Sequence, residues 1–314
     1  MSLKEMLAVK YPIIQGGMAR ISKGVLASSV ANAGGLGLVG TGGLTTEEFT
    51  HELQLAREMT KEGGVFGANI VLMEGDVEAK IQAAIDAKVA VIVLAAGNPK
   101  PWVQPIKDEG ILVFCVVGNA KMAKKSEELG ADAIIIEGLE AGGHIGNVTT
   151  MSTLPQVVEA VNVPVIAAGG IATGGQILAA QIMGASGVQM GTRFLVADET
   201  PIHDNFKDAI VAYEGHQTDL TGSPHAVRQL SNKMTQEYIR LTEEGAPAEE
   251  IRKVYAGSLS RAVYEGDVET GSMMAGISVG LVHKRDSMQG IFNQLISEYQ
   301  EAKQALAKQE DFLY

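Results

Sequence analysis

The sequence has few cysteines and no long apolar run, and each shortage excludes a class of protein. The single cysteine, Cys115, excludes a disulfide within the chain. Its place in the apolar run of residues 111–117 favours a small buried side chain over a catalytic thiol. No His or Cys residues cluster with metal-ligand spacing, so we predict no metal site. No apolar run reaches the roughly 20 residues that cross a bilayer, and no secretion signal is present, so we expect a cytoplasmic protein.

Positive charge is also scarce. The 25 Lys and Arg residues stand against 37 Asp and Glu residues, a net charge of -12, which argues against nucleic acid or an anionic membrane as a partner. The 314 residues can bury a complete core, and single-domain barrels commonly have such lengths.

Short apolar segments alternate with amphipathic, helix-like segments along the first 195 residues. The apolar segments are nearly continuous rather than alternating, which is typical of a parallel sheet covered on both faces. Eight of them indicate a (β/α)8 TIM-type barrel of the α/β class, and an open doubly wound sheet is the alternative. The expected strands are residues 12–15, 37–39, 66–72, 90–95, 112–117, 133–137, 163–167 and 187–190.

The rhythm of strands ends after Thr192. Polar, helix-leaning segments follow, and they predict a smaller, mainly helical domain at residues 196–283 that contributes to a substrate channel. We expect residues 271–276 to return the chain to the mouth of the barrel. The barrel domain then comprises residues 1–195 and 284–314.

Glycines follow the seventh and eighth expected strands, where (β/α)8 barrels commonly bind phosphate through backbone N–H groups. Gly169, Gly170 and Gly191 would let the backbone approach phosphate oxygens, because a Cβ would hold it away. Thr192 adds a hydroxyl group. We therefore predict a phosphate site at this end of the barrel.

Other residues near these strand ends suit a large planar ring. The amides of Asn69 and Gln189 can bond to a heterocycle edge, and Met18, which follows Gly17, and Met190 can pack beside it. Flavin mononucleotide (FMN) meets all of these requirements. A sugar phosphate would leave the amides and methionines unused.

His144 is the candidate acid–base residue. Gly142 and Gly143 let its imidazole stand clear of the backbone, and histidine gives or takes a proton near pH 7. Glu137 and Asn98 lie near the ends of the sixth and fourth expected strands, where barrel active sites are built. Each residue alone also fits ordinary turn chemistry, and their joint placement is what favours an enzyme.

Seven segments together resemble one flavin superfamily, which contains nitronate monooxygenases and FMN-dependent type II enoyl-acyl-carrier-protein reductases. The resemblance covers essentially the whole chain. The segments are residues 11–18, 33–37, 66–69, 96–99, 137–146, 166–171 and 189–194.

Within this superfamily, residues 141–146 are more similar to the reductases. The monooxygenases more often carry an arginine where Ile145 stands, and residues 266–276 also resemble the reductases. Departures from the reductase pattern concern recognition of the acyl substrate rather than the flavin site. They fall at Arg20, Glu74-Gly75, Val117-Gly118 and Pro224-His225. His225 is the second candidate, after His144, for the acid–base residue.

The resemblance implies that NADH or NADPH reduces FMN, which then passes hydride to the β-carbon of a trans-2-enoyl thioester. His144 would stabilise or protonate the resulting enolate, and Met274, Ala275 and Gly276 would line the substrate channel. A monovalent cation is required by some such reductases. We also expect a homodimer. The alternatives are a nitronate monooxygenase using FMN and dioxygen, a quinone reductase, and a flavin-binding sensor.

Acyl-carrier protein is the transient partner that this resemblance implies. Because such carriers are acidic, docking needs a local basic surface. Lys121, Lys124 and Lys125 follow the fifth expected strand, and Arg228 and Lys233 lie in the small domain. A solvated helix face is the other interpretation of these lysines.

Overall fold

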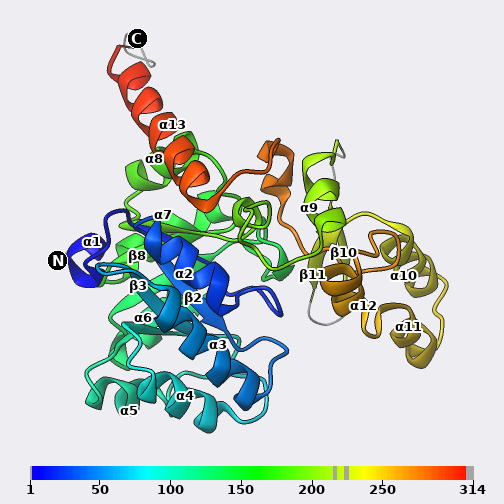
Figure 1. The fold of residues 1–314 in the computed structure, drawn as a ribbon, viewed down its shortest axis with the longest axis horizontal. Helices are drawn as coiled ribbons and strands as arrows, with labels where there is room; N and C mark the ends of the chain where they lie inside the picture. The colour runs from blue at the N-terminus through cyan, green and yellow to red at the C-terminus, as the bar shows by residue number, and fades with distance from the viewer. Residues whose placement is uncertain (1, 215–217, 223–225, 309–314) are drawn as a thin grey trace.

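The computed structural model describes residues 2–214, 218–222 and 226–308. Its centre is a closed barrel of eight parallel strands (Figure 1). Strand β1 pairs with β2 on one side and with β9 on the other, with Ile14 opposite Gln189, and this pairing closes the sheet. The strands are β1 Ile13–Gln15, β2 Leu36–Gly40, β3 Val65–Val71, β4 Val91–Ala95, β5 Leu112–Val117, β6 Ala133–Glu137, β8 Val165–Ala168 and β9 Gly187–Met190. The predicted barrel is confirmed, and closure excludes the open doubly wound sheet.

Both faces of each strand are buried, which explains the continuous apolar segments in the sequence. Residues such as Val93, Phe114 and Ile135 fill the inside of the barrel, while their neighbours face the surrounding helices. Cys115 belongs to the outer layer and is buried, and burial raises the pKa of its thiol to about 11. The interpretation of Cys115 as a packing residue is confirmed.

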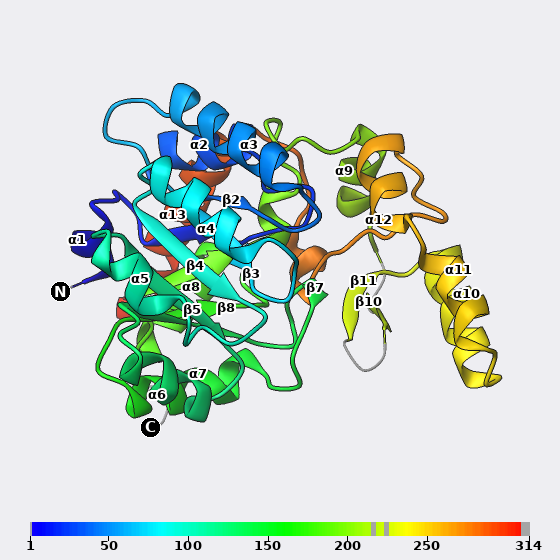
Figure 2. The same ribbon diagram turned by 90° about the horizontal axis from the view of Figure 1, so that it is seen from below.

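Helices cover the outside of the barrel (Figures 1 and 2). Several begin with a capping box, as at Thr45 and Thr173, where the side chain and the third helical residue bond reciprocally. The covering helices are α2 Gly24–Asn32, α3 Thr46–Met59, α4 Val77–Asp86, α5 Val103–Asp108, α6 Ala120–Glu128, α7 Thr150–Ala160, α8 Gly174–Ile182 and α13 Met288–Lys308. The short helix α1, Leu3–Leu7, adds Leu3 and Leu7 to the apolar cluster inside the barrel and so closes its amino-terminal end.

The chain leaves the barrel after a 3₁₀ turn, η1 Thr192–Phe194, and returns before α13. An isolated bridge between Ala197 and Asp286 holds the outgoing and returning segments side by side. Phe194 stacks on Phe292 of α13 with ring centroids 5.8 Å apart, which anchors the crossing point to the barrel. The division at residues 195 and 284 remains a prediction, and this bridge lies close to it.

The excursion between these points lies beside the carboxyl-terminal end of the barrel (Figure 2). It contains helices α9 Asp204–Val211, α10 Lys233–Glu243, α11 Ala248–Tyr255 and α12 Ser258–Ser260, a π-helical turn Arg261–Glu265 and a 3₁₀ turn Ile277–Leu281. Two strands that the sequence did not predict, β10 Thr218–Thr221 and β11 Val227–Leu230, form an antiparallel pair. Strand β7, Gly143–His144, extends this pair into a three-stranded sheet.

Candidate active site

Three polar side chains point into the carboxyl-terminal mouth of the barrel. Side chains alternate between the two faces of a strand, and Ile135 and Ile166 identify the inner positions on their strands. The same alternation directs Asn69, Glu137 and Gln189 inward near the carboxyl ends of β3, β6 and β9. The amides and the carboxyl group expected from the sequence therefore share one opening.

The loop after β1 approaches two of these side chains closely. A Cβ on Gly17 would overlap the Asn69 carboxamide, and one on Gly16 would lie 3.5 Å from the Gln189 amide nitrogen. The Oε1 atom of Gln189 is buried and accepts no hydrogen bond from any described residue. Because a buried acceptor without a donor costs free energy, this atom favours a ligand that donates to it.

The loops after β8 and β9 form the expected cradle. Gly169 and Gly170 have φ values of +88° and +80°, which side chains rarely tolerate. The backbone N–H groups of Gly170, Gly191 and Thr192 donate to no other described residue. These free donors suit a phosphate group.

His144 lies at the edge where the barrel meets the small domain. It is exposed and pairs with Val227 of β11, so the backbone on both sides of it is held in a sheet. The preceding Gly143 has φ +75°, and a Cβ there would lie 3.5 Å from the Met274 sulfur. No described residue hydrogen-bonds to the imidazole, which leaves it available to a substrate.

Residues 274–276 pack against the loop that carries Gly142 and Gly143. A Cβ on Gly142 would come within 2.6 Å of the Ala275 carbonyl carbon, so only glycine fits there. The buried N–H of Gly276 donates to Thr192 Oγ1 at 2.9 Å. The structure thus brings together three features that the sequence predicted separately. They are the histidine turn (residues 142–144), the phosphate cradle (residues 169–170 and 191–192) and the returning segment (residues 274–276).

The carboxyl group of Glu137 has an unusually high pKa. Burial raises its pKa from 4.5 to about 7, and no described residue donates a hydrogen bond to it. Near neutral pH, this carboxyl group can therefore either donate or accept a hydrogen bond within the mouth.

Sequence reasoning missed the role of Glu140. Its carboxylate accepts hydrogen bonds from the backbone N–H of Thr150 at 3.0 Å and from the Thr150 hydroxyl at 3.1 Å, at the first residue of α7. Its backbone oxygen accepts from Ile277 N. Glu140 therefore ties the histidine loop both to α7 and to the returning segment. The preference of helix amino termini for carboxylates was the available signal.

Arg228, named from the sequence as a basic surface residue, is instead buried. Its Nε donates to the Leu139 carbonyl at 2.9 Å and its guanidinium also donates to Thr218 Oγ1 at 2.6 Å. The expectation that Arg228 offers surface charge is therefore wrong, because it braces β11 against the histidine loop. Lys233 is exposed but forms an ion pair with Glu269.

Two predicted residues are not drawn into this arrangement. Asn98 is exposed, and its Oδ1 accepts from Lys100 N within its own turn, as in ordinary Asx geometry. Met190 points away from the mouth and packs in the layer between strands and helices, while its carbonyl accepts from Gly16 N. Their binding roles stay predictions. His225 lies outside the described residues.

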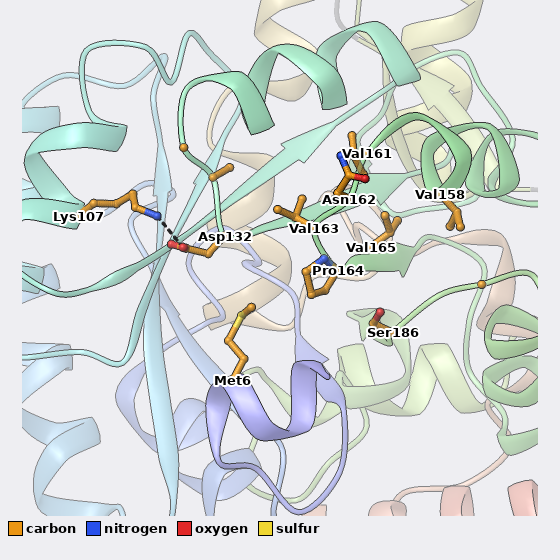
Figure 3. Close-up of a pocket in the computed structure, with 13 residues that line it drawn as sticks. Met6, Lys107, Asp132, Val158, Val161, Asn162, Val163, Pro164, Val165 and Ser186 are labelled. Carbon is orange, nitrogen blue, oxygen red and sulfur yellow. Dashed lines mark hydrogen bonds and ion pairs between the residues drawn. The ribbon is translucent and has the colours of Figure 1, made fainter. Parts of the chain in front are cut away.

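A cavity of about 630 Å³ opens at the other end of the barrel, away from these residues (Figure 3). Met6 of α1 and residues around the amino ends of β6, β8 and β9 line it. The ion pair of Lys107 and Asp132 at its edge has a structural use, because Asp132 also accepts from Val113 N at 2.8 Å. Barrel enzymes build their active sites at the opposite end, so we interpret this cavity as a gap between packed elements and not as a catalytic site.

Within the described ranges, no group of three His, Cys, Asp or Glu residues could hold a metal ion. The same residues contain no helix that is long and apolar enough to span a bilayer.

The donors and acceptors at the mouth fit FMN. Free backbone N–H groups suit its phosphate, and the orphaned Gln189 Oε1 together with the Asn69 amide suits the polar edge of its ring. Met18 lies at the entrance with its sulfur 3.5 Å from where a Gly191 Cβ would be, and so offers the ring an apolar neighbour.

Comparisons with known proteins agree on one family. A family profile described as nitronate monooxygenase matches residues 1–80 and 72–298. A probable nitronate monooxygenase from Staphylococcus aureus is 30% identical, and the match covers 93% of this chain and 96% of the relative. A (3aS,4S,5R,7aS)-5-hydroxy-7a-methyl-1-oxo-octahydro-1H-indene-4-carboxyl-CoA dehydrogenase from Rhodococcus jostii is 36% identical over 72% of this chain, and that match spans 65% of the relative's length.

Solved structures are similar over almost the whole chain. FabK from Thermotoga maritima has 36% sequence identity and a TM-score of 0.93, with 98% of both chains covered. A nitroalkane oxidase from Streptomyces ansochromogenes has 27% identity and a TM-score of 0.84, covering 98% of this chain and 100% of the other.

Proposed function

Because the chain belongs to the nitronate monooxygenase family of flavin-dependent oxidoreductases, we propose that it is an FMN-dependent enoyl-acyl-carrier-protein reductase. One observation carries the proposal: the histidine turn, the free N–H groups of the phosphate cradle and residues 274–276 meet at one barrel mouth. FabK, an enoyl-acyl-carrier-protein reductase of type II, supports this branch through its similarity to the entire fold.

Bound FMN would supply the hydride chemistry, accepting hydride from NADH or NADPH and giving it to the β-carbon of a trans-2-enoyl thioester. Negative charge then develops on the thioester oxygen and the α-carbon. His144 is exposed on β7, and no described residue hydrogen-bonds to its imidazole. It would stabilise that charge and supply the proton that completes the saturated thioester. The thioester gains one hydride and one proton, and the nicotinamide is oxidised.

The returning segment would form the wall of the substrate channel. Met274 adjoins the histidine turn, and Ala275 and Gly276 are buried against it. The reduced nicotinamide and the acyl chain would then enter the same channel at different times, which predicts ping-pong kinetics with parallel initial-rate lines. A monovalent cation, a homodimer and a cytoplasmic location belong to the same proposal.

A second function is supported by other observations. The matched family profile and the Staphylococcus aureus relatives carry the name nitronate monooxygenase. In that reaction His144 would act as a base or bind the nitronate, while FMN and dioxygen carry out the oxidation.

One assay separates the two functions. The purified flavoprotein is given NADH or NADPH with a crotonyl thioester under anaerobic conditions, and separately an alkyl nitronate in air. Nicotinamide oxidation that depends on the thioester is the expected result. Oxygen uptake with the nitronate, without thioester-dependent nicotinamide oxidation, would assign the protein to the monooxygenases.

A further inference from the structure

A groove of about 800 Å³ runs between helices α6 and α7 on the flank of the barrel. Helix α6 contributes Lys121, Lys124 and Lys125, and Glu128 lies one turn further along. Helix α7 contributes Gln156 and Glu159, with Ala120 and Ala160 completing the lining.

Positive charge gathers at one end of this groove. Helix α6 follows the carboxyl end of β5, so its first turn lies at the end of the barrel that holds the active site. The lysines occupy residues 121–125 of α6, and α7 carries no charged residue before Glu159. The acids Glu128 and Glu159 lie near the ends of their helices, away from the mouth. The lysine-lined end of the groove is therefore the end nearer the active site.

Local stability does not account for these lysines. All three are exposed, and none forms an ion pair with any described residue. Lys121 lies in the first turn of α6, where the helix dipole is positive and disfavours a cation. The three lysines thus form a local basic face in a chain with a net charge of -12.

Apolar side chains flank this basic end. Met122 in the first turn of α6 is 45% exposed, and Met151 in the first turn of α7 is 75% exposed. Methionine is enriched in surfaces that other proteins cover, so these two side chains add apolar contact area beside the lysines.

We infer that the basic end of the α6–α7 groove docks an acidic carrier protein, whose prosthetic arm then delivers the acyl thioester to the barrel mouth. The inference rests on the proposed function and names the surface that its carrier would use. Charge complementarity selects the occupant, because an acidic partner offsets the charge of three exposed lysines that form no ion pair with any described residue.

The test reverses these charges in the full-length holoenzyme. The variant Lys121→Glu, Lys124→Glu, Lys125→Glu changes the net charge from -12 to -18, since each of three substitutions changes it by -2. Glutamate at position 121, in the first turn of α6, is favoured by the helix dipole, and circular dichroism checks that the variant keeps its helices. The matched control reverses the charge at three other lysines, with Lys61→Glu, Lys303→Glu and Lys308→Glu. These lysines are also exposed and form no ion pair with any described residue.

Two thioesters separate docking from chemistry. For crotonyl-acyl-carrier protein at low salt, we expect kcat/KM of the α6 variant to fall by about tenfold or more, and the difference from wild type to shrink as salt screens the charges. For crotonyl-N-acetylcysteamine, which has no carrier, kcat/KM should stay unchanged. The control variant should resemble wild type with both substrates. Equal losses with both thioesters, or the same behaviour in both variants, would overturn the inference.

Direct binding gives a readout independent of turnover. Fluorescence anisotropy of a labelled acyl-carrier protein should show binding to wild type and to the control variant, and at least about tenfold weaker binding to the α6 variant. Binding without any thioester reduction would leave the docking surface standing and defeat the proposed function. No binding to wild type, or equally tight binding of a single-stranded oligonucleotide, would overturn the docking surface.

Discussion

The backbone N–H of Gly276 donates a hydrogen bond to the hydroxyl oxygen of Thr192, at 2.9 Å and across 84 residues of chain. Gly276 belongs to the returning segment of the small domain, and Thr192 begins the turn after the last barrel strand. The bond is buried. It therefore couples the segment that we assign to the wall of the substrate channel to the loop that we assign to phosphate binding.

Replacement of Thr192 by valine tests this coupling. The substitution keeps the shape and removes the acceptor, so a buried N–H is left without a partner, and the free energy of unfolding should fall by about 1–2 kcal/mol. Flavin affinity should fall as well, because the same hydroxyl lies in the cradle. Urea unfolding and flavin titration measure the two effects. Thr192→Ser keeps the oxygen and should recover most of both, and equal behaviour of the two variants would contradict the role of the hydroxyl.

Gly17 and Asn69 are tested as a pair. A Cβ on Gly17 would overlap the Asn69 carboxamide, so Gly17→Ala should displace that amide and lower the flavin content of the purified protein. Replacing Asn69 by glycine removes the overlap but also removes the amide. The two losses should therefore be less than additive in a double-mutant cycle of flavin affinity. Strict additivity would show that Gly17 acts without Asn69.

His144→Ala tests the acid–base assignment. We expect kcat to fall by about 10²–10⁴-fold with the flavin still bound, since general acid catalysis contributes that much. His144→Gln serves as a control that keeps a hydrogen-bond donor but cannot exchange a proton near neutral pH. Unchanged turnover in the alanine variant would assign the protein to a different chemistry or to a sensor.

Glu137 makes stability depend on pH in a defined direction. Its pKa is about 7 in the fold and near 4.5 in the unfolded chain, so the fold binds the proton more tightly. The stability that this group contributes is fully present below pH 4.5 and is lost as the pH rises through about 7. Glu137→Gln removes the ionisation, so the flavin-free variant should match wild type well below pH 4.5 and exceed its unfolding free energy by about 3 kcal/mol above pH 7.

Urea titrations across this pH range check the Glu137 prediction. The exposed Glu62, changed to glutamine, provides the control and should show no such divergence. A constant difference between Glu137→Gln and wild type at every pH would contradict the raised pKa.

The barrel was predictable from the sequence because each of its strands is buried on both faces. A run such as residues 133–137 is apolar at nearly every position, and that signal needs no knowledge of its neighbours. Strand β7 carries no such signal. It has two residues, one of them exposed, and it becomes a strand only by pairing with β11, more than 80 residues away.

The site was also predictable in part. Glycines and amides at strand ends share one face in any barrel, so their convergence followed from the fold. Gln189 and Met190 are neighbours on one strand and cannot both point inward, so only one of these two predicted contacts could hold, and Gln189 takes the inward position. The preference of helix amino termini for carboxylates was a signal for the contact of Glu140 with Thr150, but its bond to Ile277 depends on where the returning segment lies, which no local pattern encodes.

The central claim is that reduced nicotinamide and an enoyl thioester react in succession at one flavin site. Anaerobic stopped-flow absorbance of the flavin tests it most directly, first with NADH or NADPH and then with a crotonyl thioester. We predict rapid bleaching by the nicotinamide and rapid recovery of the oxidised flavin spectrum on adding the thioester. Slow bleaching, with fast oxygen-dependent turnover of an alkyl nitronate instead, would contradict the account.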